Sequence, residues 1–219
     1  MNINDVKLED LNTGSGDKLD RMFARQMELM TKYHSIEESN GLLISPDIPV
    51  DIHSAKGQFR LKDFAWRITE ELGEALEAFL KHPKIREHYN EELSDALHFL
   101  IEFTILADIA PDTFKVGEMD KLDIIFSSAW VATSRQYFSL CRDVGRVVES
   151  LAVACNCLKN KPWKNTQMMT DVDYFKKKVV DVWFRFAELC QRSGINSSML
   201  FDLYFRKSEV NKFRQRSNY

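Results

Sequence analysis

The sequence predicts an all-α fold, a helical bundle, and three observations support this prediction. The chain has 219 residues, enough to bury a substantial core, and 44% of them are hydrophobic. Only eight glycines and five prolines interrupt it. Between these breakers, apolar residues recur at intervals of three and four positions, which is the period of an amphipathic helix. We expect one domain over residues 1–219, with residues 1–17 flexible.

Six helices are expected, with boundaries defined to about four residues. The residues between them contain the glycines and prolines that break helices. Residues 41–57 include Pro46 and Pro49 and lack a helical period, so we expect an ordered loop or lid there. The expected helices are residues 18–35, 61–81, 87–108, 129–159, 171–193 and 197–216.

Composition excludes several classes of protein. The net charge of −3 provides no general attraction for nucleic acid, so we expect no nucleic-acid partner. No apolar run approaches the roughly 18 residues that span a bilayer, and the N-terminus lacks the apolar stretch of a signal peptide. We therefore expect no membrane partner and a cytoplasmic protein, in the host cytoplasm if it is phage-encoded. The four cysteines lack zinc-site spacing and are expected to be reduced thiols in the core.

Two carboxylates border the apolar stripe of the second expected helix. A projection at about 100° per residue places the buried face around Ile68, with Glu71 and Glu74 at its edge. Glu70 and Glu77 project to the opposite side, where solvent alone explains them.

The third expected helix places one carboxylate among apolar side chains. The same projection puts Glu92 between Phe99 and Phe103, and Asp95 follows one turn later on nearly the same side. An ionised carboxylate in such a place costs several kcal/mol unless a cation or hydrogen bonds compensate it. His98 projects away from the apolar stripe and is expected at the surface.

An antiparallel hairpin of these two helices would bring four carboxylates together. Oxygen ligands without cysteine suit Mg²⁺, with Mn²⁺ as the alternative, and Mg²⁺ commonly joins protein carboxylates to phosphates. The substrate class that this predicts is a polyphosphate. Either acidic motif alone is common on helices whose charged face is exposed to solvent and binds nothing.

Two separate stretches of the chain resemble one family. EELGE (70–74) followed by EELSDALHF (91–99) resembles the signature of the all-α nucleoside triphosphate pyrophosphohydrolases, the superfamily of MazG and dimeric dUTPases. YFRKSEVNKFRQ (204–215) resembles the C-terminal segment of dimeric dUTPases and phage dCTP pyrophosphatases. The resemblance implies a helical bundle of this type, a small-molecule nucleotide substrate and a homodimer.

The resemblance also implies roles for individual residues. Positions 207, 211 and 214 fall on one face of one helix, which suits convergence on one nucleotide. Leu29 stands near the place where dimeric dUTPases usually have an asparagine, so the choice between dUTP and dCTP stays open. The implied Mg²⁺ ligands are Glu71, Glu74, Glu92 and Asp95, and the implied substrate contacts are Gln26, Phe99, Lys207, Asn211 and Arg214.

The function expected from these residues is Mg²⁺-dependent hydrolysis of a deoxynucleoside triphosphate, dUTP or dCTP, to the monophosphate and pyrophosphate. Glu71 is the candidate for the base that takes a proton from the attacking water. One alternative is a helical protein that binds a nucleotide or a partner without cleaving it. A di-iron carboxylate enzyme is the other, but it needs two E-x-x-H elements, and Asp95-x-x-His98 resembles only one.

Overall fold

The computed structural model describes every residue except 1–2, 8, 10, 12, 130–136 and 218–219. Its described residues form helices and no strand, which confirms the all-α prediction. Two short 3₁₀ helices, η1 (Ile3–Asp5) and η3 (Pro111–Phe114), accompany the α-helices. The α-helices are α1 (Lys18–Ser39), α2 (Ala55–Lys81), α3 (Glu87–Leu106), α4 (Lys121–Ser128), α5 (Tyr137–Cys157), α6 (Val172–Arg192) and α7 (Ser197–Arg216).

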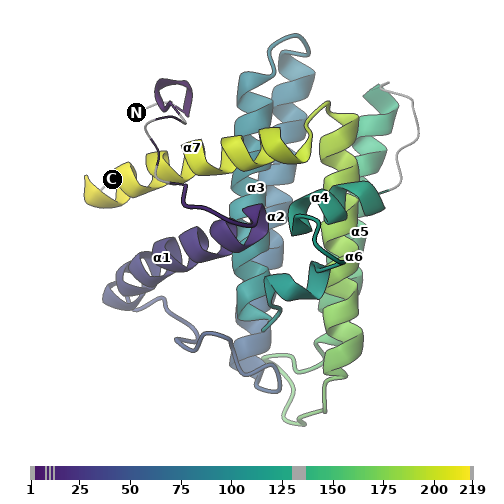
Figure 1. Cartoon of the computed structure of the whole chain (residues 1–219). Coiled ribbons are helices and arrows are strands. Elements are labelled where there is room, and N and C mark those ends of the chain that lie inside the picture. Colours follow the sequence, from purple (N-terminus) through teal and green to yellow (C-terminus); the bar gives the residue numbers. More distant parts are fainter. Residues whose placement is uncertain (1–2, 8, 10, 12, 130–136, 218–219) are drawn as a thin grey trace.

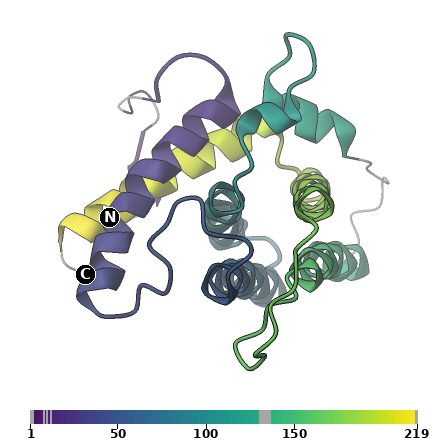
Figure 2. The same ribbon diagram turned by 90° about the horizontal axis from the view of Figure 1, so that it is seen from below.

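Four helices form a bundle and two others cross its side. Seen from below, α2, α3, α5 and α6 stand roughly parallel to one another and appear end-on (Figure 2). The pair α1 and α7 lies side by side at a large angle to them, across α3 (Figure 1). One large cluster of buried apolar side chains includes residues from all seven α-helices. This arrangement forms a corner between the α2–α3 hairpin and the α1–α7 pair.

The long helix α2 begins earlier than expected. It starts at Ala55 after the cap residue Ser54, so the expectation of a loop through residue 57 is wrong for its last three residues. Gly57 allows this early start because a Cβ atom there would overlap the carbonyl oxygen of Asp51. The remaining loop is ordered by contacts with two helices, as expected. Val50 N–H donates to Leu106 O at 3.1 Å, and the Arg60 guanidinium donates to Ser45 O at 2.6 Å.

The first turns of α1 and α4 complete each other's caps. Asp17 accepts hydrogen bonds from the backbone of α1 and also from Lys121 N–H at 2.8 Å. In return, Asp120 caps α4 and accepts from Lys18 N–H at 2.7 Å. Each carboxylate therefore satisfies free N–H groups of two helices.

One helix boundary in the middle of the chain differs from the sequence prediction. Helix α4 was not expected, and Ala129 is its C-cap rather than the start of the next helix. The expected helix 129–159 is observed as α5, which begins at Tyr137. Residues 130–136, between these two helices, lie outside the described residues.

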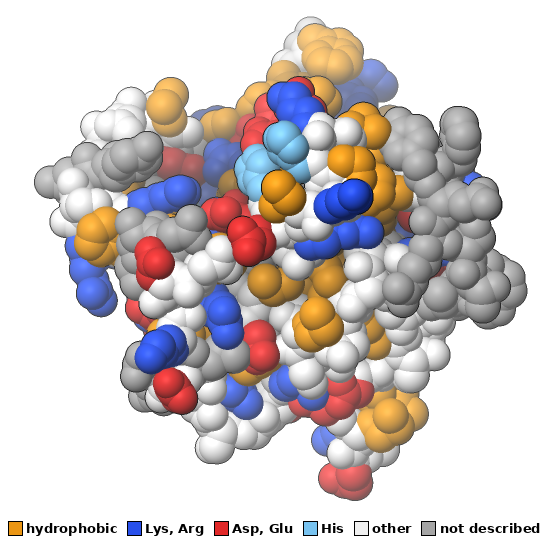
Figure 3. All heavy atoms as spheres, turned by 90° about the horizontal axis from the view of Figure 1, so that it is seen from above, with side chains coloured by type: hydrophobic (Ala, Val, Ile, Leu, Met, Phe, Trp, Pro, Cys, Tyr) orange, Lys and Arg blue, Asp and Glu red, His pale blue; other side chains and the backbone are white. Residues whose placement is uncertain are grey.

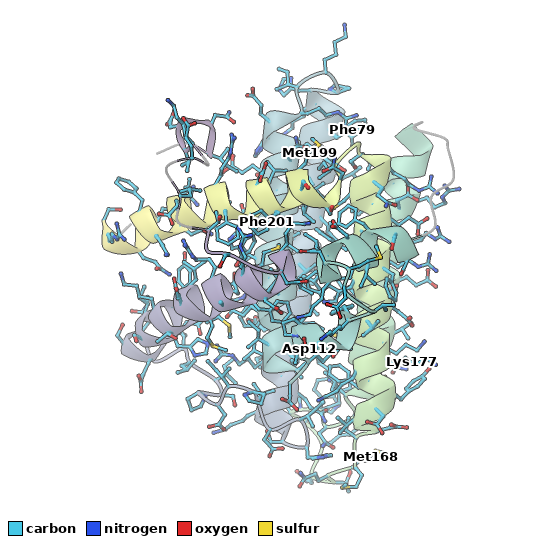
Figure 4. The ribbon with its side chains drawn as sticks, viewed as in Figure 1. Phe79, Asp112, Met168, Lys177, Met199 and Phe201 are labelled. Atoms are coloured by element: carbon cyan, nitrogen blue, oxygen red, sulfur yellow. The ribbon has the colours of Figure 1, made fainter. Side chains whose placement is uncertain are left out.

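Side chains of the terminal segments pack against α7. Ile3 and Val6 are buried and form a small cluster with Val210. Phe201 lies between α7 and α1 (Figure 4), with the guanidinium carbon of Arg21 4.4 Å from its ring centroid. Packing of this kind holds α7 against α1.

The surface agrees with the charge balance of the sequence. On the face seen in Figure 3, acidic and basic side chains are interspersed. In the described part of the chain, every helix is too short or too polar to cross a bilayer. The cysteines are free, as expected, but Cys190 alone among them is buried.

Candidate functional site

Three of the four expected metal ligands meet between α2 and α3. One carboxylate oxygen from each of Glu71, Glu74 and Glu92 lies within 4.8 Å of the others. Glu74 is exposed, Glu71 is half-buried and Glu92 is 7% exposed. We call these three residues the acidic cluster. The i, i+3 spacing on α2 and the antiparallel packing of α3 produce it.

The electrostatics of the acidic cluster suit a cation. Burial, together with the nearby Asp95, Glu92 and Glu74 carboxylates, raises the pKa of Glu71 to about 8. Close carboxylates disfavour ionisation of one another unless a positive charge offsets them. The donor set is made of carboxylate oxygens, which hard divalent cations prefer. These residues therefore fit a metal of the Mg²⁺ class.

Asp95 lies next to the cluster but has a different neighbour. The Lys207 ammonium of α7 is 2.7 Å from an Asp95 oxygen and 2.6 Å from an oxygen of Glu91. Burial acts to lower the pKa of Lys207, but these carboxylates give a net shift upward. Burial raises the pKa of Asp95 to about 6, against the opposing effect of Lys207. Lys207, 3% exposed, thus joins α7 to α3 through Asp95 and Glu91.

A cavity of about 270 Å³ opens beside the acidic cluster in the corner between α1, α2, α3 and α7. Six of the nine site residues expected from the sequence line it, whereas Glu74, Glu92 and Lys207 lie outside the lining. Phe99 lines it while packing edge-on against Phe64, with ring centroids 6.1 Å apart. The lining residues are Gln26, Leu29, Tyr33, Glu37, Arg67, Glu71, Asp95, His98, Phe99, Glu102, Asn211 and Arg214.

A chain of hydrogen bonds fixes one polar wall of the cavity. Gln26 Nε2 donates to Glu102 Oε2 at 3.0 Å. The Tyr204 hydroxyl is within hydrogen-bond distance of two acceptors, Met22 O at 2.9 Å and Gln26 Oε1 at 3.0 Å. Because an ionised carboxylate only accepts, the Gln26 amide directs its Nε2 to an ionised Glu102 and its oxygen to Tyr204. We call Gln26, Glu102 and Tyr204 the polar wall.

His98 does not lie at the surface, and that prediction is wrong. It is 4% exposed, and its ring stacks on Tyr204 with centroids 4.2 Å apart. Its Nδ1 is 2.8 Å from Ser94 O, so Nδ1 carries the proton and Nε2 is an acceptor. Burial lowers the pKa of His98 to about 3, and its buried Nε2 has no hydrogen-bond partner within the described part of the chain. The packing of α7 across α3 covers a face that an isolated helix would expose.

Several lining residues were not predicted. Glu102 had a signal in the sequence, since it is the one charged residue in the apolar run from Ala96 to Ala107. Arg67 and Glu37 had none, because each is an ordinary charged residue on an amphipathic helix. They pair at 3.3 Å across α1 and α2.

A second, larger hollow of about 580 Å³ lies along α1 and α7. Its lining residues include Arg21, Arg25 and Lys212 but none from the acidic cluster. It therefore does not join the carboxylates to a ligand, and the smaller cavity is the candidate site.

Comparison with known proteins gives one match. The model of a family described as dUTPase matches residues 65–219, which covers most of α2 and all of α3 to α7. The match includes the acidic cluster, Lys207, Asn211 and Arg214, and it leaves Gln26 outside. No curated protein and no solved structure matches the chain.

Proposed function

Because this chain belongs to the all-α dUTPase family, we propose that it hydrolyses a pyrimidine deoxynucleoside triphosphate, dUTP or dCTP, to the monophosphate and pyrophosphate. The observation that carries the proposal is the shared cavity. Glu71 of the acidic cluster and the neighbouring Asp95 line it, together with amide groups (Gln26, Asn211) and guanidinium groups (Arg67, Arg214). A cavity with this lining can hold both the triphosphate and the nucleoside of one substrate.

Mg²⁺, or Mn²⁺ in its place, would be held by Glu71, Glu74, Glu92 and Asp95. A divalent ion bound there supplies positive charge to the triphosphate and lowers the pKa of a bound water. The acidic cluster meets the requirement for such an ion, because its oxygens already lie within 4.8 Å of one another.

Glu71 is the proposed base. Its carboxylate takes a proton from the water that attacks phosphorus, which requires a group held within hydrogen-bond reach of that water. Its position fits this role because it belongs to the acidic cluster and also lines the cavity.

Groups from α7 are proposed to bind the rest of the substrate. Arg214 stabilises negative charge on the phosphates, and Asn211 contacts the nucleoside. Both line the cavity, one turn of helix apart. Lys207 is also proposed to contact phosphate, for which its ammonium must move away from Asp95 and Glu91. Phe99 and Gln26 line the part that would receive the sugar and base.

The biological setting belongs to the same proposal. The chain acts as one domain and assembles as a homodimer in the cytoplasm, where it removes dUTP or dCTP from the nucleotide pool used for DNA synthesis. Light scattering after size-exclusion chromatography measures the assembly, and a monomeric mass would contradict it.

The test is pyrophosphate release from a panel of deoxynucleoside triphosphates with and without Mg²⁺. Release that needs Mg²⁺ and occurs with dUTP or dCTP supports the proposal. Absence of release from every nucleotide would overturn it in favour of a binding protein, and stoichiometric iron in protein purified without added metal would favour the di-iron alternative.

The proposed base has its own test. Glu71→Gln is expected to lower kcat by about 100-fold or more, since a general base contributes that much. The matched control is Glu70→Gln, which changes an exposed carboxylate on the same helix. Retention of wild-type kcat in Glu71→Gln, with Mg²⁺ bound, would refute the role of Glu71.

A further inference from the structure

Glu102 is a buried carboxyl group that the proposed reaction does not use. It is 4% exposed and lines the cavity seven residues after Asp95 on α3. Seven residues of α-helix correspond to about 10 Å along the axis. Glu102 is therefore separated from Asp95, beside the acidic cluster, by a distance that suits the base of a nucleotide rather than its phosphates.

The hydrogen bonds of Glu102 leave most of its accepting capacity unused. In the described part of the chain, Gln26 is the one side chain that donates to it. Arg60 directs its guanidinium to Ser45 O, His34 and Glu37. Because His34 Nε2 accepts from Arg60, it does not donate to the Glu102 oxygen 4.0 Å away. A carboxylate has about four lone-pair positions, so it can accept from a ligand as well.

A second acceptor lies near this carboxylate. The Gln26 oxygen is within hydrogen-bond distance of the Tyr204 hydroxyl, and one Gln26 N–H is occupied by Glu102 itself. Among the described residues, His98 Nε2, one turn earlier on α3, has no hydrogen-bond partner. A ligand that brings hydrogen-bond donors to the polar wall gains the most binding free energy, because a buried acceptor without a partner costs free energy.

We propose that Glu102 selects the base and favours cytosine over uracil by accepting a hydrogen bond from the exocyclic amino group. The 4-amino group of cytosine offers two N–H donors. Uracil has a carbonyl oxygen at this position, and its only donor, N3–H, lies between two carbonyl oxygens. These oxygens would face an ionised carboxylate and be repelled by it. This inference rests on the proposed function, since it names the substrate of the same cavity.

A neighbouring apolar side chain supports the same choice. Leu29 lines the cavity and is 1% exposed. A leucine cannot donate to the carbonyl oxygen of uracil, whereas an amide can. Position 29 therefore offers uracil no compensation for its repulsion by Glu102.

The test compares kcat/KM for three substrates with wild-type protein and Mg²⁺. These are dCTP, dUTP and the deoxyriboside triphosphate of 2-pyrimidinone, which is cytosine without its amino group. We expect dCTP to exceed each of the others by about 10- to 100-fold, the effect of one hydrogen bond to a charged group. Glu102→Gln is expected to bring the dCTP-to-dUTP ratio to within a few-fold of one, because its amide can donate to uracil as well as accept from cytosine, and to lower the dCTP-to-pyrimidinone ratio because the acceptor is no longer charged. Glu87→Gln, an exposed carboxylate on the same helix, is the matched control and should retain them.

The outcomes separate this inference from the proposed function. Equal use of dCTP and dUTP, a preference for dUTP, or an equal loss for all substrates in Glu102→Gln would overturn the role of Glu102 while hydrolysis stands. Hydrolysis of none of the three would overturn both. If Glu102→Gln fails to fold, the three wild-type ratios alone decide.

Discussion

The substitution Glu102→Gln keeps the size of the side chain and its ability to accept from Gln26, but it removes the ionisable group. Burial raises the pKa of Glu102 to about 7 from an ordinary 4.5, while Gln26 and two arginines oppose the shift. The charged and titratable side chains that face Glu102 from α1, α2 and α7 are Tyr33, His34, Glu37, Arg60, Arg67 and Tyr204.

The direction of the effect on stability follows from linkage. Between pH 4.5 and about 7, native Glu102 holds a proton that the unfolded chain has released. The free energy of unfolding therefore falls as pH rises through this window and changes no further above it. The pKa of Glu102 differs between the native protein (about 7) and the unfolded chain (4.5). At about 1.4 kcal/mol per pKa unit, this difference changes the free energy of unfolding by about 3 kcal/mol. Because Glu102 is only 4% exposed, screening by solvent reduces this figure very little.

The assay is urea unfolding without metal at pH 5 and pH 8 for wild type, Glu102→Gln and the control Glu87→Gln. We expect the free energy of unfolding of Glu102→Gln to rise by about 3 kcal/mol relative to that of wild type when the pH changes from 5 to 8. The corresponding gain in Tm is about 6–12 °C for a chain of this size. Glu87→Gln should follow wild type at both pH values.

If the free energies of unfolding of Glu102→Gln and wild type differ by the same amount at pH 5 and at pH 8, this reasoning is refuted. Such a result would mean that the native carboxyl group ionises as readily as in the unfolded chain. The rise of the dCTP-to-dUTP ratio between pH 6 and pH 8 that is predicted below would then be lost, whereas selection of a donor by an ionised Glu102 would stand.

Three further predictions concern other contacts of the site and core. In wild type, the kcat/KM ratio of dCTP to dUTP should rise about tenfold from pH 6 to pH 8 as Glu102 ionises, and a flat ratio would contradict this. Lys207→Met should lower the free energy of unfolding at pH 8 by about 2–3 kcal/mol, because Asp95 and Glu91 lose their partner, whereas Lys207→Arg should restore part of it. Thr104→Val should lower the free energy of unfolding by about 1–3 kcal/mol, because it leaves the buried Trp183 N–H without an acceptor, and kcat should not change. An unaltered midpoint of urea unfolding would contradict this prediction.

The helices that carry the site were predictable because their apolar period is long and their ends are marked. The expected range 197–216 is that of α7, and the expected ranges for α2 and α3 contain the whole acidic cluster. Helix α4 was missed because eight residues give little more than two turns of periodic pattern. Asp120, its cap residue, was the available signal.

The candidate site was predictable where one helix sets the geometry and not where two helices cross. The projection that placed Glu92 inside an apolar surface agrees with its burial. The same projection misplaced His98, because a single helix carries no information about the crossing of α7. The pairing of Lys207 with Glu91 and Asp95 depends on the same crossing, so the sequence alone could not predict it.

The reciprocal caps of α1 and α4 affect how far the site can be separated from the rest of the chain. Gln26, Glu102 and the acidic cluster all lie within the first 102 residues. Yet the first turn of α1 is completed by Asp120, which accepts from Lys18 N–H. A fragment with α1, α2 and α3 alone would keep these side chains but leave the start of α1 without that anchor. Transplanting the site into another helical scaffold therefore requires a substitute for α4 as well as for α7.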